Sequence, residues 1–374
     1  MSGNASRVLG IVALAAAAWT AGCSGGEGTP AAPVSSLTRY DCLIVRLADG
    51  AMEEVTSKGF PEYYRWDAAP AEGPSRPAAE RTAQLLGTEV RIAVYNVDAA
   101  PGEDAVAEAM ARVAEISRKF NLFDPKSDVS LINREGATRP VPLDGDVETL
   151  LLRSRDLAQL SGGAFDVTVG PLTDLWRKSR AAGKLPTDDE IASARACVGF
   201  DKVILAGAPG KRTVKFARAG MSFDFGGIAK GYAAEEAAKV LARRDIRSAV
   251  IACAGSVKLM GVRPDGLPFR IGISDPRPPH RNLFILPLRD ASIDTSGNYR
   301  QFTEIDGKRY SHIIDPRTGK SIEALPSVTV VGPDGATCDA LATAVGVLGV
   351  DDGLKLLDRV NAGTNPGAPP PRTE

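Results

Sequence analysis

The chain is organised around one stretch, Ser222-Phe223-Asp224-Phe225-Gly226-Gly227-Ile228-Ala229-Lys230-Gly231-Tyr232-Ala233-Ala234-Glu235. The apolar run at 221–225 predicts the end of a strand, the two glycines predict a turn, and a helical spacing of apolar residues begins at Ile228. A glycine turn that leads into a helix N-terminus can form an anion pocket, because unpaired N–H groups and the helix dipole meet there. The stretch lacks the P-loop and dinucleotide fingerprints. A tight strand-to-helix connection without a ligand is the alternative interpretation.

The N-terminus has the features of an export signal. Arg7 supplies a positive charge, and residues 8–19 form an apolar segment too short for a stable transmembrane anchor. Thr20-Ala21-Gly22-Cys23 resembles a bacterial lipoprotein cleavage box, although Thr20 stands where an aliphatic residue is usual. We therefore expect residues 1–23 to be a signal peptide and Cys23 to carry the lipid that anchors the chain to a membrane, on the periplasmic side of a bacterial envelope. Ordinary secretory cleavage is the alternative.

The composition indicates a globular protein with low-complexity segments near both ends. The formal net charge is -1, so nothing favours a nucleic-acid partner. We predict a tether and N-terminal extension at 24–80, with a possible strand at 42–47, a folded domain at 81–361 and a disordered tail at 362–374. Four cysteines besides Cys23 form no CxxC or metal-ligand pattern, and the sequence alone does not decide whether any two pair.

Strands and helices mix within residues 81–361, without an internal repeat. We predict strands at 85–95, within 202–224, and at 248–252, 256–262, 269–274, 283–288, 310–314 and 327–331. Helices are predicted at 103–120 and 146–160, and from about 228, 337 and 351. Hairpin-like spacings outnumber βαβ units. The fold class is therefore expected to be α+β, with mixed, largely antiparallel sheets and flanking helices.

Three further stretches contain residues suited to chemistry. In the first, at 161–172, glycines end a helix and Phe165 and Asp166 enter a segment predicted to be extended. Phe165 could stack on a flat ring, and Asp166 could accept a hydrogen bond from a ring N–H or a hydroxyl. The alternative is that Phe165 belongs to the core and Asp166 closes a turn.

The second stretch contains one of only two histidines in the chain. His280 lies among prolines, whereas His312 lies between strand-like residues and before an Asp-Pro turn. That placement suits a general acid or base. A buried, hydrogen-bonded structural histidine is the alternative.

In the third stretch, Asp339 and Thr343 lie four residues apart, so a helix would present both on one face. A carboxylate and a hydroxyl at that spacing make half of an oxygen site for Mg²⁺, which usually keeps waters and takes other oxygens from phosphates or carbonyls. The alternative is an aspartate that caps the helix and a threonine that faces the core.

Together these stretches resemble the ApbE family of FAD:protein FMN transferases. The matching segments occur in the family's order and the resemblance covers about residues 85–360; they are 162–172, 224–233, 295–297, 310–319 and 338–344. Leu86 stands where the family has methionine, Cys338 where it has alanine, and Ala342 where it has serine.

The resemblance implies an ApbE-like fold with an FAD cleft between two subdomains. It also implies an enzyme that splits FAD, attaches FMN to a threonine or serine of a partner flavoprotein and releases AMP. Mg²⁺ would be bound by Asp339, Thr343 and the carbonyl of Gly227, and His312 would be the catalytic residue that handles the hydroxyl's proton. The FAD contacts it implies are Leu86, Phe123, Ala164, Phe165, Asp166, Asp224, Lys230 and Ile313.

Two other functions remain open at this point. One is a Mg²⁺-dependent FAD pyrophosphatase that uses the same site with water as the nucleophile. The other is a flavin-binding lipoprotein without catalysis.

Overall fold

The computed structural model describes residues 40–48, 51–58, 76–276, 282–297, 302–305, 307–322 and 325–363. Four predicted features lie wholly or largely outside the described residues: the signal peptide with Cys23, most of the tether and extension, nearly all of the tail, and His280. Among the described residues, no helix is both long enough and apolar enough to cross a membrane.

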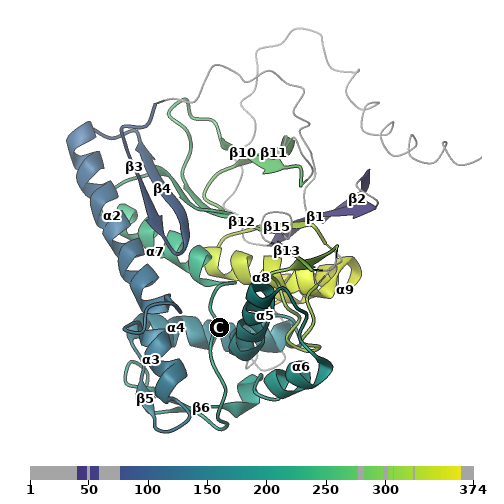
Figure 1. Cartoon of the computed structure of the whole chain (residues 1–374). Coiled ribbons are helices and arrows are strands. Elements are labelled where there is room, and N and C mark those ends of the chain that lie inside the picture. The colour runs from purple at the N-terminus through teal and green to yellow at the C-terminus, as the bar shows by residue number, and fades with distance from the viewer. Residues whose placement is uncertain are drawn as a thin grey trace, which may run out of the picture. The chain divides into compact units, whose positions relative to one another are not determined.

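One large sheet carries much of the fold (Figure 1). Its eight strands have the order β2-β1-β15-β12-β9-β8-β4-β3, and every neighbouring pair is antiparallel. This confirms the predicted α+β class. The strands are β1 (Asp41–Ala48), β2 (Ala51–Lys58), β3 (Ala79–Leu85), β4 (Thr88–Tyr95), β8 (Ser248–Cys253), β9 (Ser256–Met260), β12 (Ser292–Gly297) and β15 (Ser327–Gly332).

Three smaller sheets and eight α-helices complete the described fold. The smaller sheets pair β10 (Phe269–Ser274) with β11 (Asn282–Leu288), β13 (Phe302–Ile305) with β14 (Lys308–Ser311), and β7 (Thr213–Phe216) with both β5 (Val141–Pro142) and β6 (Val203–Ala206). The helices are α2 (Ala99–Phe120), α3 (Asp128–Glu135), α4 (Gly145–Leu160), α5 (Gly170–Ala182), α6 (Asp188–Arg195), α7 (Ala229–Arg243), α8 (Gly335–Leu348) and α9 (Val350–Asn361).

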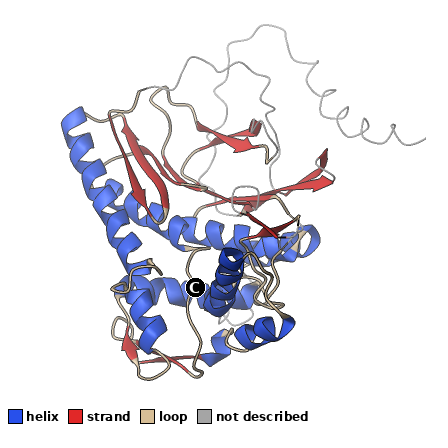
Figure 2. Cartoon of the chain, in the orientation of Figure 1, coloured by secondary structure: helices blue, strands red, loops and turns tan. Residues whose placement is uncertain are grey.

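Both faces of the large sheet are covered, because alternate residues of a strand point to opposite sides. On β4, Ile92 and Val94 join the core formed with α2, α7 and α8, whereas Ala93 and Tyr95 join a second core with β10 and β11. Figure 2 shows blue helices along one side of the large sheet, with the short strands of a smaller sheet beyond them. The layer of α7 and α8 is the one that carries the candidate site.

A buried carboxylate, Asp146 at the start of α4, ties α4 to two other helices. It accepts hydrogen bonds from Arg112 and Lys119 of α2 and from the Tyr232 hydroxyl of α7. Burial alone would raise the pKa of Asp146, but Arg112, Lys119 and Tyr232 outweigh it and hold that pKa below its usual value. The ionised form is therefore the one that stabilises the fold.

Removing this charge gives a prediction for stability. Asp146→Asn should lower the free energy of unfolding at neutral pH by about 2–3 kcal/mol, because Arg112 and Lys119 lose the hydrogen bonds that they donate to a buried carboxylate and keep only their other acidic partners. Since the folded-state pKa is lowered, this stabilisation is complete above the unfolded value of about 3.9 and is lost as the pH falls below it. Urea unfolding at pH 7 and pH 3 should therefore show a gap between variant and wild type that shrinks in acid.

Glu115→Gln is the matched control, because Glu115 bonds the same Arg112 and Lys119 but its side chain is 40% exposed. Glu115→Gln should lower the free energy of unfolding by less than about 1 kcal/mol. Equal losses in the two variants would contradict the role given to Asp146.

The structure corrects several of the predictions. The folded body begins before residue 81, because β1 pairs with β15 and β3 starts at Ala79. Residues 221–225 are not a strand, since the backbone N–H of Phe223 donates to the Asn133 side chain and that of Asp224 to the carbonyl of Val167.

The segment after Asp166 is not extended. It forms a 3₁₀ turn at Val167–Val169 and then the helix α5, whose first turn contains Pro171. Proline suits that position because its fixed φ is helical and its missing N–H would have no helical partner there.

Candidate functional site

The candidate site lies where α7 and α8 begin, and two glycines allow the helices to meet there. A Cβ on Gly231 would lie 2.0 Å from the carbonyl oxygen of Gly335, and one on Gly335 would lie 2.6 Å from that of Gly231. No side chain fits at either position, so the backbones can approach closely. This contact brings the stretch at 222–235 against the stretch that contains Asp339.

Asp339 is held at the N-terminus of α7. Its Oδ2 accepts a hydrogen bond of 3.2 Å from the backbone N–H of Gly231, and Lys230 Nζ lies 3.4 Å away. The carboxylate thus takes the position that the sequence predicted for an anion, where first-turn N–H groups lack helical partners. Asp339 is not the cap of its own helix, because Asp334 caps α8 by accepting from the Thr337 N–H.

A second buried carboxylate lies beside the first. Asp294, on β12, is 2% exposed, as is Asp339. Its Oδ1 accepts a hydrogen bond of 2.9 Å from the Ser256 hydroxyl, whereas its buried Oδ2 receives none from the described part of the chain. Burial, followed by the charge of Asp339, raises the pKa of Asp294 well above its usual value, against the opposing effects of Lys230 and Ser256.

Lys230 is the cation that faces this acidic pair. Its Nζ also donates a hydrogen bond of 2.8 Å to the carbonyl of Gly226, which fixes the side chain across the glycine turn. Burial would lower the pKa of Lys230, but Asp339 and Asp294 outweigh burial and raise it. The lysine is therefore charged, and the group of one lysine and two carboxyls has an excess of acidic groups.

The glycine turn also brings an aromatic ring and two hydroxyls to the same place. A Cβ on Gly227 would lie 3.0 Å from Thr343 Oγ1 and 3.5 Å from the Phe165 ring. The Ser296 hydroxyl of β12 lies 3.4 Å from the Thr343 hydroxyl. The structure thus brings together four of the predicted site residues, Gly227, Lys230, Asp339 and Thr343, with Phe165 beside them.

These donors fit a hard divalent cation. The described residues contain no group of three or more His, Cys, Asp and Glu side chains arranged to hold a metal. Here, two carboxyls, a threonine hydroxyl and the Gly227 backbone supply only oxygens, the ligand type that Mg²⁺ prefers. The Asp294 oxygen that lacks a hydrogen bond adds a buried acceptor that a cation could satisfy.

The remaining predicted residues of the 161–172 stretch are buried. Ala164 is 1% exposed, and Phe165, 4% exposed, belongs to the main core. Asp166 caps the 3₁₀ turn, because its Oδ1 accepts from both the N–H and the hydroxyl of Thr168. Burial raises the pKa of Asp166 despite these bonds.

Helix α5 connects several predicted residues that are distant in sequence. Its Thr173 donates a hydrogen bond of 2.8 Å to Asp224, and the Arg177 guanidinium lies 5.1 Å from the centre of the Phe123 ring. Arg180 donates a hydrogen bond of 3.0 Å to the carbonyl of Ser311, the residue before His312. The sequence patterns described above do not single out Thr173, Arg177 or Arg180. Their spacing of i, i+4 and i+7 on one helix face, directly after the 161–172 motif, is the sequence signal.

His312 and Ile313 follow β14 on a segment fixed by hydrogen bonds. The Ser311 hydroxyl accepts from the Ile313 N–H, and the Ser311 carbonyl accepts from Arg180 and Ser321. His312 is half-buried and Ile313 is buried. In the large sheet, Leu86 and Gly87 form the two-residue turn between β3 and β4, both with positive φ, and the Leu86 N–H donates to Ser117.

Arg180 gives a local test of this arrangement. Arg180→Ala should raise amide exchange at residues 311–313 about ten- to one-hundred-fold, because a hydrogen bond from a charged donor is lost. Hydrogen–deuterium exchange followed by mass spectrometry measures the exchange rate of these amides, with the amides of β15 as an internal reference. The control is Lys178→Ala on the same helix, which removes a 75% exposed side chain paired with Asp174 and should change nothing. Unchanged exchange at 311–313 in Arg180→Ala would refute the role of this bond.

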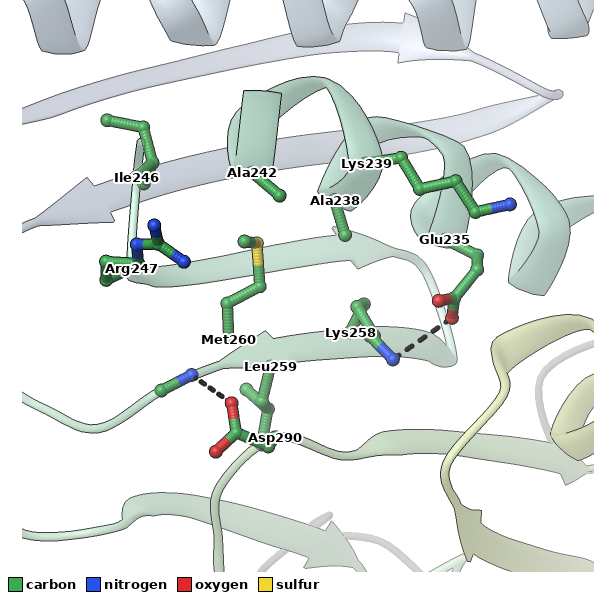
Figure 3. A pocket seen from close by; sticks show the side chains of 11 residues that line it. Glu235, Ala238, Lys239, Ala242, Ile246, Arg247, Lys258, Leu259, Met260 and Asp290 are labelled. Atoms are coloured by element: carbon green, nitrogen blue, oxygen red, sulfur yellow. Dashed lines mark hydrogen bonds and ion pairs between the residues drawn. The ribbon is translucent and has the colours of Figure 1, made fainter. Parts of the chain in front are cut away.

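A pocket of about 310 Å³ lies elsewhere, between α7 and β9 (Figure 3). Lys258 pairs with Glu235 across it at 3.1 Å, and Asp290 accepts from the Gly261 N–H. None of the predicted site residues lines it. The charged side chains that line this pocket pair with other protein groups. The candidate site therefore remains at the start of α7 and α8.

Comparisons with known proteins give matches over most of the chain. The profile of the ApbE family matches residues 86–365. FAD:protein FMN transferase of Haemophilus influenzae is 30% identical over 268 residues, which cover 70% of this chain and 78% of that protein. The flavin transferase ApbE from Vibrio cholerae superposes with a TM-score of 0.65 at 30% identity, covering 74% of this chain and 89% of its own. The ApbE protein from Thermotoga maritima gives 0.67 at 30% identity, covering 76% and 92%.

Proposed function

The chain belongs to the ApbE family, and from this premise we propose that it is a Mg²⁺-dependent FAD:protein FMN transferase acting on a serine or threonine hydroxyl. The observation that carries the proposal is the buried Asp339 carboxylate, held at the start of α7 by Lys230 and the Gly231 N–H, with Thr343 and Gly227 beside it. Family membership supports flavin transfer to a protein. The oxygen donors support the metal.

In this proposal Asp339, Thr343 and the carbonyl of Gly227 hold Mg²⁺. The bound ion would supply charge stabilisation for the phosphoryl oxygens of the FAD pyrophosphate. Lys230 adds a second positive charge at the same place, fixed there by Gly226 and Asp339. Phe165 lies against Gly227, where its ring can limit access of water.

The proposed reaction balances without a redox partner. The hydroxyl oxygen of the acceptor attacks the phosphorus of the FMN half of FAD and forms a phosphoester bond. The bond between that phosphorus and the bridging oxygen breaks, and AMP leaves with the electron pair. His312 takes the proton of the hydroxyl as general base. We also assign FAD contacts to Leu86, Phe123, Ala164, Asp166, Asp224 and Ile313.

The experiment that tests this function follows AMP. The full chain is incubated with FAD and Mg²⁺, with and without a flavoprotein that carries a serine or threonine acceptor motif, and AMP is quantified by chromatography. A transferase should release AMP rapidly only when the acceptor is present. Release at the same rate without acceptor would instead identify an FAD pyrophosphatase, and no release under either condition would leave only flavin binding.

We further propose that lipid modification at Cys23 places this activity at the membrane, on the periplasmic side of the envelope. The basis is the sequence of residues 1–23 alone. An anchored enzyme would meet acceptor proteins at the same surface.

A further inference from the structure

Asp294 is the one carboxyl of the site to which the proposed function assigns no role. It is 2% exposed, and its Oδ2 receives no hydrogen bond from the described residues. The Ser256 hydroxyl donates to the other oxygen, Oδ1, and the neighbouring Asp339 carboxyl also interacts with the Asp294 side chain. Burying a carboxylate oxygen that no donor satisfies lowers the stability of the fold. A bound ligand at this oxygen would remove that cost.

The register of β12 places this oxygen at the metal site. Alternate residues of a strand share a face, and on β12 both neighbours of Asp294 on that face point to the helices. The hydroxyl of Ser292 lies 3.5 Å from Glu235 Oε2 of α7, and the hydroxyl of Ser296 lies 3.4 Å from Thr343 Oγ1 of α8. Asp294 lies between these two contacts, opposite Asp339.

The local charges lead to the same position. The Lys230 ammonium forms its ion pair with Asp339 at 3.4 Å. Asp294 has a neutral hydroxyl as its donor instead of a cation. Two acidic side chains therefore share one lysine in a buried site, and a divalent cation would complete the balance.

We propose that Asp294 is an additional carboxylate of the divalent-cation centre, with Oδ2 as an oxygen ligand, either direct or through one coordinated water. The inference rests on the proposed metal site of Asp339, Thr343 and Gly227. The cation would then be bound by residues from three parts of the fold: the glycine turn, α8 and strand β12 of the large sheet.

The test is cation affinity, measured without turnover. Mn²⁺ is titrated into the full chain, with and without saturating FAD, and free Mn²⁺ is quantified by electron paramagnetic resonance. Asp294→Asn keeps the shape and removes the charge, and it should weaken Mn²⁺ binding about 10- to 100-fold. Its metal-free melting temperature should not fall, because an amide can donate to Asp339. Asp294→Ser serves if the asparagine variant does not fold.

Two controls separate this role from a general loss of charge or packing. Ser256→Ala removes the hydroxyl that holds Oδ1 but keeps the carboxylate, so affinity should stay within a few-fold of wild type. Glu148→Gln removes another buried carboxylate, one that is held by the Gly210 N–H and Arg212 far along the chain. It should leave Mn²⁺ binding unchanged.

The outcomes distinguish this inference from its premise. Wild-type affinity in both Asp294 variants would overturn the role of Asp294 and leave the proposed function intact. Failure of the wild-type chain to bind Mn²⁺, with or without FAD, would overturn both the metal site and this inference. Selective loss in the Asp294 variants supports it.

Discussion

Asp339→Ala is expected to reduce FMN transfer by at least about 10³-fold while the chain still folds and binds FAD. The carboxylate is a charged ligand of the proposed cation, and the cation contributes several kcal/mol to stabilising charge in the transition state. Flavin binding depends on more of the site than this ligand, so FAD affinity should change less than the rate. Transfer rates at saturating FAD, and FAD titration by fluorescence, measure the two effects separately.

The control for Asp339→Ala is Asp352→Ala, which removes a carboxylate from the exposed side of α9, where it pairs with Lys355. It should transfer FMN at the wild-type rate. Circular dichroism should confirm that both variants fold. Near-normal transfer by Asp339→Ala at low Mg²⁺ would exclude this residue as a ligand.

His312→Asn is expected to slow FMN transfer by roughly 10²–10⁴-fold, the usual contribution of a positioned proton acceptor. Asparagine keeps a polar group near the position of the imidazole Nδ1 but cannot take the proton. The segment is held by Arg180 and Ser321 through the Ser311 carbonyl, so the substitution should leave its backbone in place. FAD affinity should therefore stay close to that of wild type, and the acid limb of the pH–rate profile should disappear.

A structural role for His312 would give a different pattern. FAD binding and stability would then weaken in His312→Asn, and the acid limb would persist. That result would remove the general base from the mechanism but would not change the family assignment. Ser321→Ala is a useful comparison, because it loosens the same segment without touching the imidazole.

Much of the fold could be predicted from local patterns. The helices α2, α4, α7, α8 and α9 follow from apolar residues at helical spacing, and the strands β8, β10, β11 and β15 from β-branched and apolar runs. The strand β12 was missed, because Ser292-Ile293-Asp294-Thr295-Ser296-Gly297 is short and mostly polar. It is a strand because β9 and β15 pair on its two sides, which no local pattern shows.

The same limit applies to the site. The spacing of Asp339 and Thr343 predicts that they share a helix face, and the glycine turn predicts an anion position at the start of α7. Only the packing shows that Asp339 itself takes that position, because it depends on the approach of Gly231 to Gly335. Asp294 and Arg180 act through neighbours on other elements, so their own sequence context gave little sign of them.

The most direct test of the proposed function is the intact mass of an acceptor flavoprotein after incubation with the full chain, FAD and Mg²⁺. We predict a mass increase equal to FMN less one water, dependent on Mg²⁺ and absent when the acceptor's serine or threonine is replaced by alanine. Consumption of FAD to free FMN and AMP, with the acceptor's mass unchanged, would contradict it.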